Sequence, residues 1–212
     1  MGSGRTRLEH HTAVDPTGGS TPGQGAIAGL ELFASGWGGP TLVGLWAFGE
    51  AIVLPVVPDV ALGLLVLAAP RRAAVLFAAL VAGSLAGTAV LYAAVLAAPD
   101  AVTSMILALP GIDGAMLADA RAIVATGDPF AIALFGPGTP LKVDSLAWAT
   151  GPASPLALAL GVVVNRVTRV GPGLVVVALL GRFAPGYVRR HERLVLLAYA
   201  TFWVVLYALY LS

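Results

Sequence analysis

Seven polar or charged side chains interrupt otherwise apolar stretches of the chain, and these are the residues that could do chemistry. They are Glu50, Asp59, Lys142, Asp144, Asn165, Arg166 and Arg169. Ionisable residues in apolar segments are costly, and they commonly bind ions, relay protons or pair with one another. The seven are therefore candidates for a binding site, and equally for a buried ion-pair network that only fixes the packing of the helices.

The composition predicts that these residues lie in a membrane. Hydrophobic residues make up 58% of the chain and charged residues 11%, with a mean hydropathy of +0.89, whereas soluble domains carry roughly 25% charged residues. The formal net charge of +1 gives no indication of nucleic-acid binding. The absence of cysteine excludes disulfides, thiolate metal sites and thiol catalysis. We expect an all-α integral membrane protein with no cofactor.

Three segments are predicted to span the bilayer, which needs about 20 helical residues. Residues 73–98 contain no charged side chain, and residues 194–211 carry aromatic side chains of the type found at membrane interfaces. The third span, residues 155–180, contains Asn165, Arg166 and Arg169. Residues 1–25 have no apolar period and are predicted to be a disordered tail, which leaves 26–212 as a single membrane domain.

Two further apolar segments, residues 42–69 and 130–150, are predicted to be re-entrant helical hairpins. Each is interrupted near its centre by prolines, which remove a backbone donor and disfavour helix at the preceding residue. The breaks are at Pro55 and Pro58 and at Pro137 and Pro140. Irregular backbone at membrane depth is tolerated only where protein or a water-filled cavity satisfies it.

The loop charges predict how these segments are oriented. Arg71 and Arg72 precede the first span, and a second basic cluster runs from Arg182 to Arg193, whereas residues 99–128, predicted to be an outer amphipathic segment, are mainly acidic. The positive-inside rule places both basic clusters in the cytoplasm. The two hairpins then have opposite orientations, and the fold is an inverted repeat with about three full transmembrane helices.

Inverted repeats with broken helices are a recurring transporter design, with the binding site near the midplane where the discontinuous helices meet. The first break would bring Glu50 and Asp59 inward, and the second would bring Lys142 and Asp144 from the other side. Exposed helix ends at such breaks can hold ions or polar headgroups. The two tips are therefore expected to approach each other.

Four motifs in this order resemble the DedA family, also called the VTT or SNARE-associated Golgi protein family. The first is GEAIVLPVVPD, and the second is the helix GSLAGTAVLY, whose Gly83 and Gly87 also suit close helix packing. The third, FGPGTPLKVDSLAWATG, is similar to a subgroup with Pro-x-Lys at the second break, and the fourth, NRVTRVG, has the two arginines of that subgroup. The resemblance covers about residues 40–185.

The resemblance implies lipid transport in a multi-pass protein of the bacterial cytoplasmic membrane. The substrate would be a lipid phosphate, either undecaprenyl phosphate or a phospholipid. Lys142, Arg166 and Arg169 could bind the phosphate, since guanidinium and ammonium groups suit that anion. Glu50 and Asp59 would compensate these cations in the absence of substrate. We hypothesise that phosphate displaces a carboxylate from an arginine, which couples headgroup entry to proton uptake.

Two other classes of function stay open. An intramembrane enzyme acting on a lipid phosphate would also use arginines, but it usually adds a histidine or another nucleophile, and His191 lies in the basic loop rather than in an apolar segment. A structural membrane subunit would use the buried charges for packing alone. An oligomer is compatible with either class.

Overall fold

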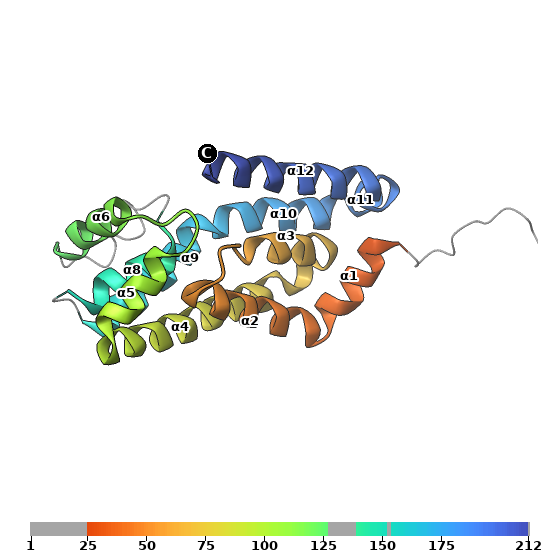
Figure 1. Cartoon of the computed structure of the whole chain (residues 1–212). Coiled ribbons are helices and arrows are strands. Elements are labelled where there is room, and N and C mark those ends of the chain that lie inside the picture. Colours follow the sequence, from red (N-terminus) through yellow and green to blue (C-terminus); the bar gives the residue numbers. More distant parts are fainter. Residues whose placement is uncertain (1–24, 127–138, 152–153, 212) are drawn as a thin grey trace, which may run out of the picture.

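The computed structural model describes residues 25–126, 139–151 and 154–211, and every regular element within those ranges is a helix (Figure 1). The elements are α1 (Ala26–Ser35), α2 (Gly38–Ile52), α3 (Asp59–Ala68), the short 3-10 helix η1 (Pro70–Arg72), α4 (Ala73–Ala97), α5 (Pro99–Leu107), α6 (Gly114–Val124), α8 (Leu141–Ala149), α9 (Pro155–Arg169), α10 (Gly171–Phe183), α11 (Pro185–Arg190) and α12 (Glu192–Leu211). The predicted all-helical class is confirmed. The tail predicted for residues 1–25 lies outside the described ranges up to residue 24.

Two helices, α4 and α12, are long and apolar enough to cross a bilayer, which agrees with the spans predicted for residues 73–98 and 194–211. The span predicted for residues 155–180 is instead two helices, α9 and α10, bent by 43° where they meet at Val170. Pro172 explains the bend, because it has no backbone N–H and its ring clashes with the carbonyl four residues earlier. The bent pair counts as a third possible span.

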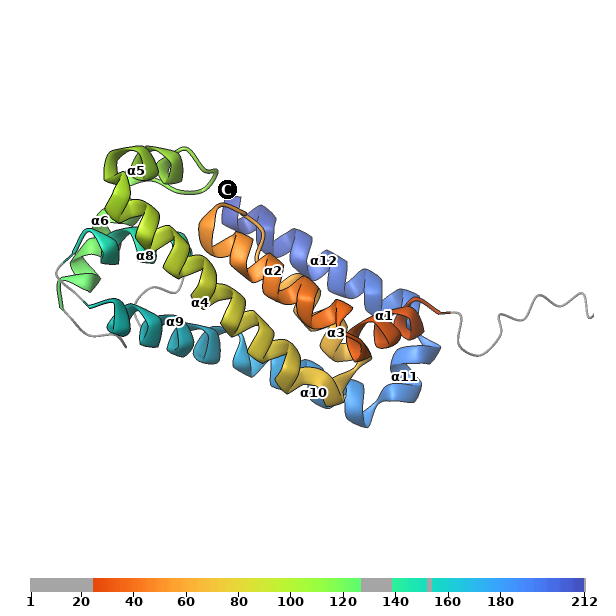
Figure 2. The ribbon, with the colours of Figure 1, turned by 90° about the horizontal axis from the view of Figure 1, so that it is seen from below.

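The first predicted break separates α2 from α3. α2 ends at Ile52 and α3 begins at Asp59, and the two helices run back alongside each other (Figures 1 and 2). The reversal contains Pro55 and Pro58, as predicted. A Cβ atom added to Gly87, near the centre of α4, would meet Ala51 in the last turn of α2. The chain therefore reverses beside the middle of α4 rather than beyond its end.

Small residues let α2 and α4 approach closely. A Cβ atom at Gly83 would collide with the carbonyl of Gly44, and one at Gly87 would collide with the carbonyl of Phe48. Glycines four residues apart lie on one face of a helix, which is the small-xxx-small arrangement of close helix pairs. The packing role predicted for Gly83 and Gly87 is confirmed.

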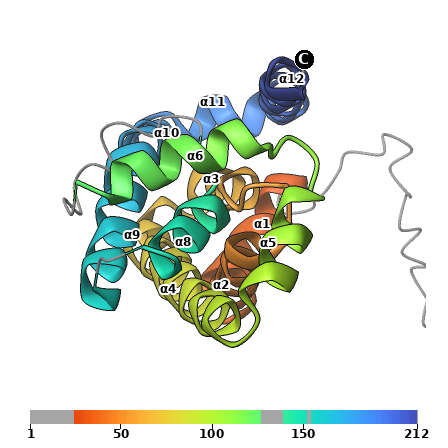
Figure 3. The same ribbon diagram turned by 60° about the vertical axis from the view of Figure 1, so that its left-hand side comes forward.

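The short helix α8 is the most buried element. Eight consecutive residues, from Leu141 to Trp148, are buried, and Figure 3 shows α8 between α4, α6 and α9. Pro140 immediately precedes it in an extended conformation, so the second predicted break coincides with the start of a helix. Residues 130–138, which include Pro137 and the first arm of the second predicted hairpin, lie outside the described ranges.

Four arginines gather at the end of the molecule that lies opposite α5 and α6. Arg71 and Arg72 line one pocket together with Arg182 and Arg189, near α1 and α11. α5 and α6, which form most of the predicted acidic segment, lie at the other end (Figures 1 and 2).

The amphipathic character predicted for the acidic segment is confirmed in α6. Leu117, Ala120 and Val124 are buried, whereas Asp119 and Arg121 are exposed. Asp113 caps the helix by accepting a hydrogen bond from the N–H of Met116 (2.8 Å). One face of α6 therefore packs on the bundle, and its charged face points away from it.

Candidate functional site

Five of the six predicted binding residues line one cavity of about 380 Å³. Glu50 comes from α2, Asp59 from α3, Lys142 from α8, and Arg166 and Arg169 from α9. The cavity walls also include Pro55 and Pro140, one from each of the two breaks, and Asn165. Residues separated by more than a hundred positions in the sequence therefore meet in one place.

A buried ion pair between Arg166 and Glu50 forms one wall of the cavity. Each side chain is only 6% exposed. Arg166 also donates from Nε to the hydroxyl of Ser84 on α4 (2.9 Å). Burial of a charge is tolerable when the charge is paired and its remaining donors find acceptors. Glu50 and Ser84 therefore make the buried position of Arg166 tolerable.

Lys142 joins the two breaks directly. Its ammonium donates to the carbonyl of Leu54, within the reversal between α2 and α3 (2.6 Å). The residue is 3% exposed, and no carboxylate of the described residues lies within ion-pair distance of it. An ammonium has three donors and no acceptor, so Lys142 has further donors to offer to an anion in the cavity.

Two polar atoms on the cavity wall are buried without a hydrogen-bond partner among the described residues. They are Oδ1 of Asp59 and Nε1 of Trp203. Most buried polar atoms in proteins are paired with protein or with water. Asp59 and Trp203 both line the cavity, and the carboxylate of Asp59 keeps an acceptor that no described residue satisfies.

Side chains from three helices satisfy the irregular backbone between α2 and α3. Trp46 donates from its indole to the carbonyl of Val56 (2.8 Å), and the N–H of Val57 donates to the hydroxyl of Tyr207 (2.7 Å). The third contact is the one from Lys142 described above. Unwound backbone in a low-dielectric setting needs such partners. These hydrogen bonds therefore fix the backbone conformation of the break.

The two arginines of NRVTRV have different surroundings. They are three residues apart in α9 and hence share a face of the helix. Arg166 is buried, whereas Arg169 is exposed. Among the described residues, Arg169 makes a single long hydrogen bond, from Nη1 to the carbonyl of Thr139 (3.4 Å). Arg169 therefore has most of its donors available at the cavity.

Asp144 is the one predicted binding residue that is not among the described residues lining the cavity. It is buried, at 4% exposure, in α8. Lys142 and Asp144 are two residues apart, and such residues do not face each other on a helix. Because the segment after Pro140 is a helix rather than an extended tip, only Lys142 of this pair reaches the cavity.

Residues of α12 and of the loop between α5 and α6 complete the cavity, and the motifs gave no indication of them. They include Trp203, Leu206, Tyr207, Leu109, Pro110 and Ile112. One signal was present in the sequence: Tyr199, Trp203 and Tyr207 recur every four residues and so share one face of α12. Tyr199 donates to the carbonyl of Val60 (2.9 Å), which ties this aromatic face to α3.

The cations that line the cavity outnumber its carboxylates, which suits the binding of an anion. Three cationic side chains and two carboxylates line it, and the described residues contain no cluster of His, Asp or Glu side chains that could hold a metal ion. Comparisons of the chain with family models, with curated proteins and with solved structures found no match.

Proposed function

We propose that this chain is a DedA-like membrane protein that moves a lipid phosphate across the bilayer. The observation that carries the proposal is the cavity between the two helix breaks, where Lys142, Arg166 and Arg169 face Glu50 and Asp59. A phosphate group suits this set, since guanidinium and ammonium groups are its usual protein ligands. Undecaprenyl phosphate and ordinary phospholipids are the two candidate substrates.

The surface supports a membrane location. Among the described side chains of α12, six large apolar ones are more than half exposed, namely Leu194, Leu197, Phe202, Val204, Val205 and Leu209. Contiguous apolar surface of this kind is unfavourable in water and favourable in lipid. With the basic end in the cytoplasm, as the positive-inside rule requires, the acidic helices α5 and α6 lie on the outer side of the bacterial cytoplasmic membrane.

The arrangement of the breaks supports the inverted repeat. α2 and α3 reach the cavity from the basic end of the molecule, whereas α8 lies toward the acidic end (Figures 1 and 2). Discontinuous helices that meet from opposite sides are the usual site of substrate binding in inverted-repeat transporters. In this arrangement the Lys142–Leu54 hydrogen bond is one of the contacts between the two repeats, together with the Arg166–Glu50 ion pair.

The proposed mechanism is an exchange of partners at Arg166. A phosphate entering the cavity first meets the available donors of Arg169 and Lys142, and then competes with Glu50 for the guanidinium of Arg166. A buried carboxylate without a partner is unfavourable, so the displaced Glu50 takes up a proton. Release of the phosphate on the other side reverses both steps, which makes proton coupling a consequence of the ion pair.

A liposome assay tests the proposal. The purified chain is reconstituted with a fluorescent polyprenyl phosphate or a fluorescent phospholipid, and both transbilayer movement and released inorganic phosphate are measured, with and without a pH gradient. We expect movement of at least one of the two lipids above the rate in protein-free liposomes, with no phosphate released. Release of phosphate would identify a lipid-phosphate-processing enzyme instead, and the absence of both would indicate a structural subunit.

A further inference from the structure

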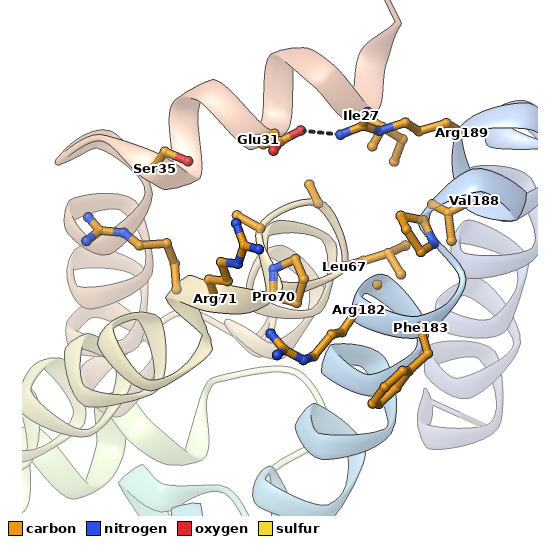
Figure 4. A pocket seen from close by; sticks show the side chains of 15 residues that line it. Ile27, Glu31, Ser35, Leu67, Pro70, Arg71, Arg182, Phe183, Val188 and Arg189 are labelled. Carbon is orange, nitrogen blue, oxygen red and sulfur yellow. Dashed lines mark hydrogen bonds and ion pairs between the residues drawn. The ribbon is translucent and has the colours of Figure 1, made fainter.

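A second pocket, of about 600 Å³, lies at the basic end of the molecule (Figure 4). Its walls come from α1, from the end of α3, from η1 and from the junction of α10 with α11. Four arginines line it, and Glu31 is its single acidic residue. The arginines are Arg71, Arg72, Arg182 and Arg189. We call it the basic pocket.

The arginines of the basic pocket are largely uncompensated. Arg189 pairs with Glu31 at 3.0 Å across the pocket, and this pair is exposed (Figure 4). Arg72 donates to two backbone carbonyls at the end of α1, at 3.3 and 3.4 Å. Arg71 and Arg182 have no hydrogen bond or ion pair within the described part of the chain. Two guanidinium groups with all their donors available face the same space.

The pocket also has an apolar side, which a site for a fully hydrated anion would not need. Ile27, Leu67, Ala68 and Val188 form a buried cluster behind it. Phe183, at its rim, is 76% exposed. Arginines clustered at the end of an apolar helix are typical of a surface that contacts anionic lipid headgroups. The pocket thus combines cations for a headgroup with apolar surface for the start of a lipid chain.

The basic pocket and the cavity between the helix breaks are separate sites. Asp59, at the start of α3, lines the cavity, and Ala68, at its end, lines the basic pocket. At 1.5 Å per residue, this helix places them about 14 Å apart. One phosphate group cannot contact the arginines of both.

We propose that the basic pocket is a second anion site, which binds the phosphate of an anionic lipid headgroup at the membrane surface. Arg71 and Arg182 supply the free donors. Glu31 competes with the phosphate for Arg189, and it does so weakly because exposed ion pairs contribute little. Binding at the basic pocket does not require transport. This proposal can therefore be tested independently of the function proposed for the cavity between the helix breaks.

Binding to the full chain in detergent micelles tests this site. The probes are dioctanoyl phosphatidic acid, dioctanoyl phosphatidylcholine and inorganic phosphate, and the readout is the ligand-dependent shift of the unfolding temperature, which yields a Kd. We expect phosphatidic acid to bind more tightly than phosphatidylcholine or inorganic phosphate. Equal potency of inorganic phosphate would support the anion site and assign it to a soluble ligand.

Four variants locate the binding. Arg71→Gln/Arg182→Gln should weaken the binding of phosphatidic acid by about tenfold or more, whereas Glu31→Gln should strengthen it several-fold. Arg190→Gln, exposed and outside the pocket lining, is the matched control and should change Kd by less than about twofold. Lys142→Gln, which changes a residue of the cavity between the helix breaks, should lower the affinity for phosphatidic acid much less than the Arg71→Gln/Arg182→Gln variant does.

Three results would overturn the proposal. The first is an unchanged Kd in the Arg71→Gln/Arg182→Gln variant. The second is a loss of affinity for phosphatidic acid in Lys142→Gln as large as in that double variant, which would place the lipid in the cavity between the helix breaks. The third is equal affinity for phosphatidylcholine. If the glutamine double variant does not fold, Arg71→Lys/Arg182→Lys keeps the charges and should bind phosphatidic acid more weakly than the wild type, because lysine lacks the bidentate contact.

Discussion

Removing one partner of the buried Arg166–Glu50 ion pair should destabilise the protein more than removing both. Each side chain is 6% exposed, so Glu50→Gln leaves a buried guanidinium without its counter-charge, and Arg166→Gln leaves a buried carboxylate. Breaking a buried pair from one side costs about 3–5 kcal/mol. For a chain of this size that corresponds to a fall in Tm of about 6–20 °C.

The double variant Glu50→Gln/Arg166→Gln leaves no unpaired charge. We expect it to unfold within a few degrees of the wild type, so that the coupling free energy between the two positions is about 2 kcal/mol or more. Glu31→Gln is the matched control, because it removes an ion pair whose side chains are 65% and 43% exposed. Loss of that exposed pair should cost no more than about 1 kcal/mol. Thermal unfolding in detergent micelles, followed by circular dichroism, is measured for the four variants and the wild type.

A loss of stability in the double variant equal to the sum of the losses in the two single variants would refute this reasoning. It would show that Glu50 and Arg166 do not compensate each other. The double variant also separates the two roles that the sequence left open for these charges. If it remains folded and loses lipid movement in liposomes, the pair belongs to the binding site. If it moves lipid at the wild-type rate over a range of pH, the pair serves packing alone and the proposed exchange at Arg166 is wrong.

Two further substitutions test the packing around the first break by thermal unfolding. Gly83→Ala should lower the free energy of unfolding by about 1–3 kcal/mol, since its Cβ would collide with the backbone of α2. The control, Gly29→Ala on α1, meets no atom within 4 Å and should stabilise the protein by up to about 1 kcal/mol. Equal effects of the two substitutions would contradict the close approach of α2 and α4. Tyr207→Phe removes the acceptor for the N–H of Val57 and should cost about 1–3 kcal/mol, whereas the exposed Tyr187→Phe should change stability by less than about 0.5 kcal/mol; a neutral Tyr207→Phe would show that the break does not depend on α12.

Local chemistry explains what could be predicted from the sequence. Prolines such as Pro55 and Pro58 disrupt the interior of a helix, and an uncharged run such as residues 73–98 has few alternatives to a long helix. The cationic and acidic residues of the cavity were found because a charge is conspicuous against an apolar background. These inferences need no knowledge of which segments touch.

Features that depend on packing could not be predicted in this way. The pairing of Arg166 with Glu50, rather than with Asp59, depends on how α2, α4 and α9 meet. Asp144 was predicted as a ligand because of its type, but the helical form of α8 turns it away from the face that carries Lys142. The bend at Val170 is different, because Pro172 was visible in the sequence and is a local cause.

The contacts of the aromatic face of α12 also could not be predicted from the sequence. Trp203 and Tyr207 lie in a helix that reads as an ordinary span with interfacial aromatic residues. Their contacts with the first break, through Val57 and the cavity, are made across 150 positions of sequence. Four-residue spacing identifies the shared face, but only the fold identifies its partner.

Chemical blockage of the cavity tests the central claim most directly. The chain has no cysteine, so Leu206→Cys introduces a unique thiol on the cavity wall, and Val204→Cys, 68% exposed on α12 and outside the cavity lining, is its control. After reaction with a bulky maleimide, the rate of lipid-phosphate movement in liposomes is measured for both variants. The account predicts that the Leu206→Cys protein falls to the rate of protein-free liposomes while the Val204→Cys protein keeps its rate; undiminished movement by fully modified Leu206→Cys protein would contradict it.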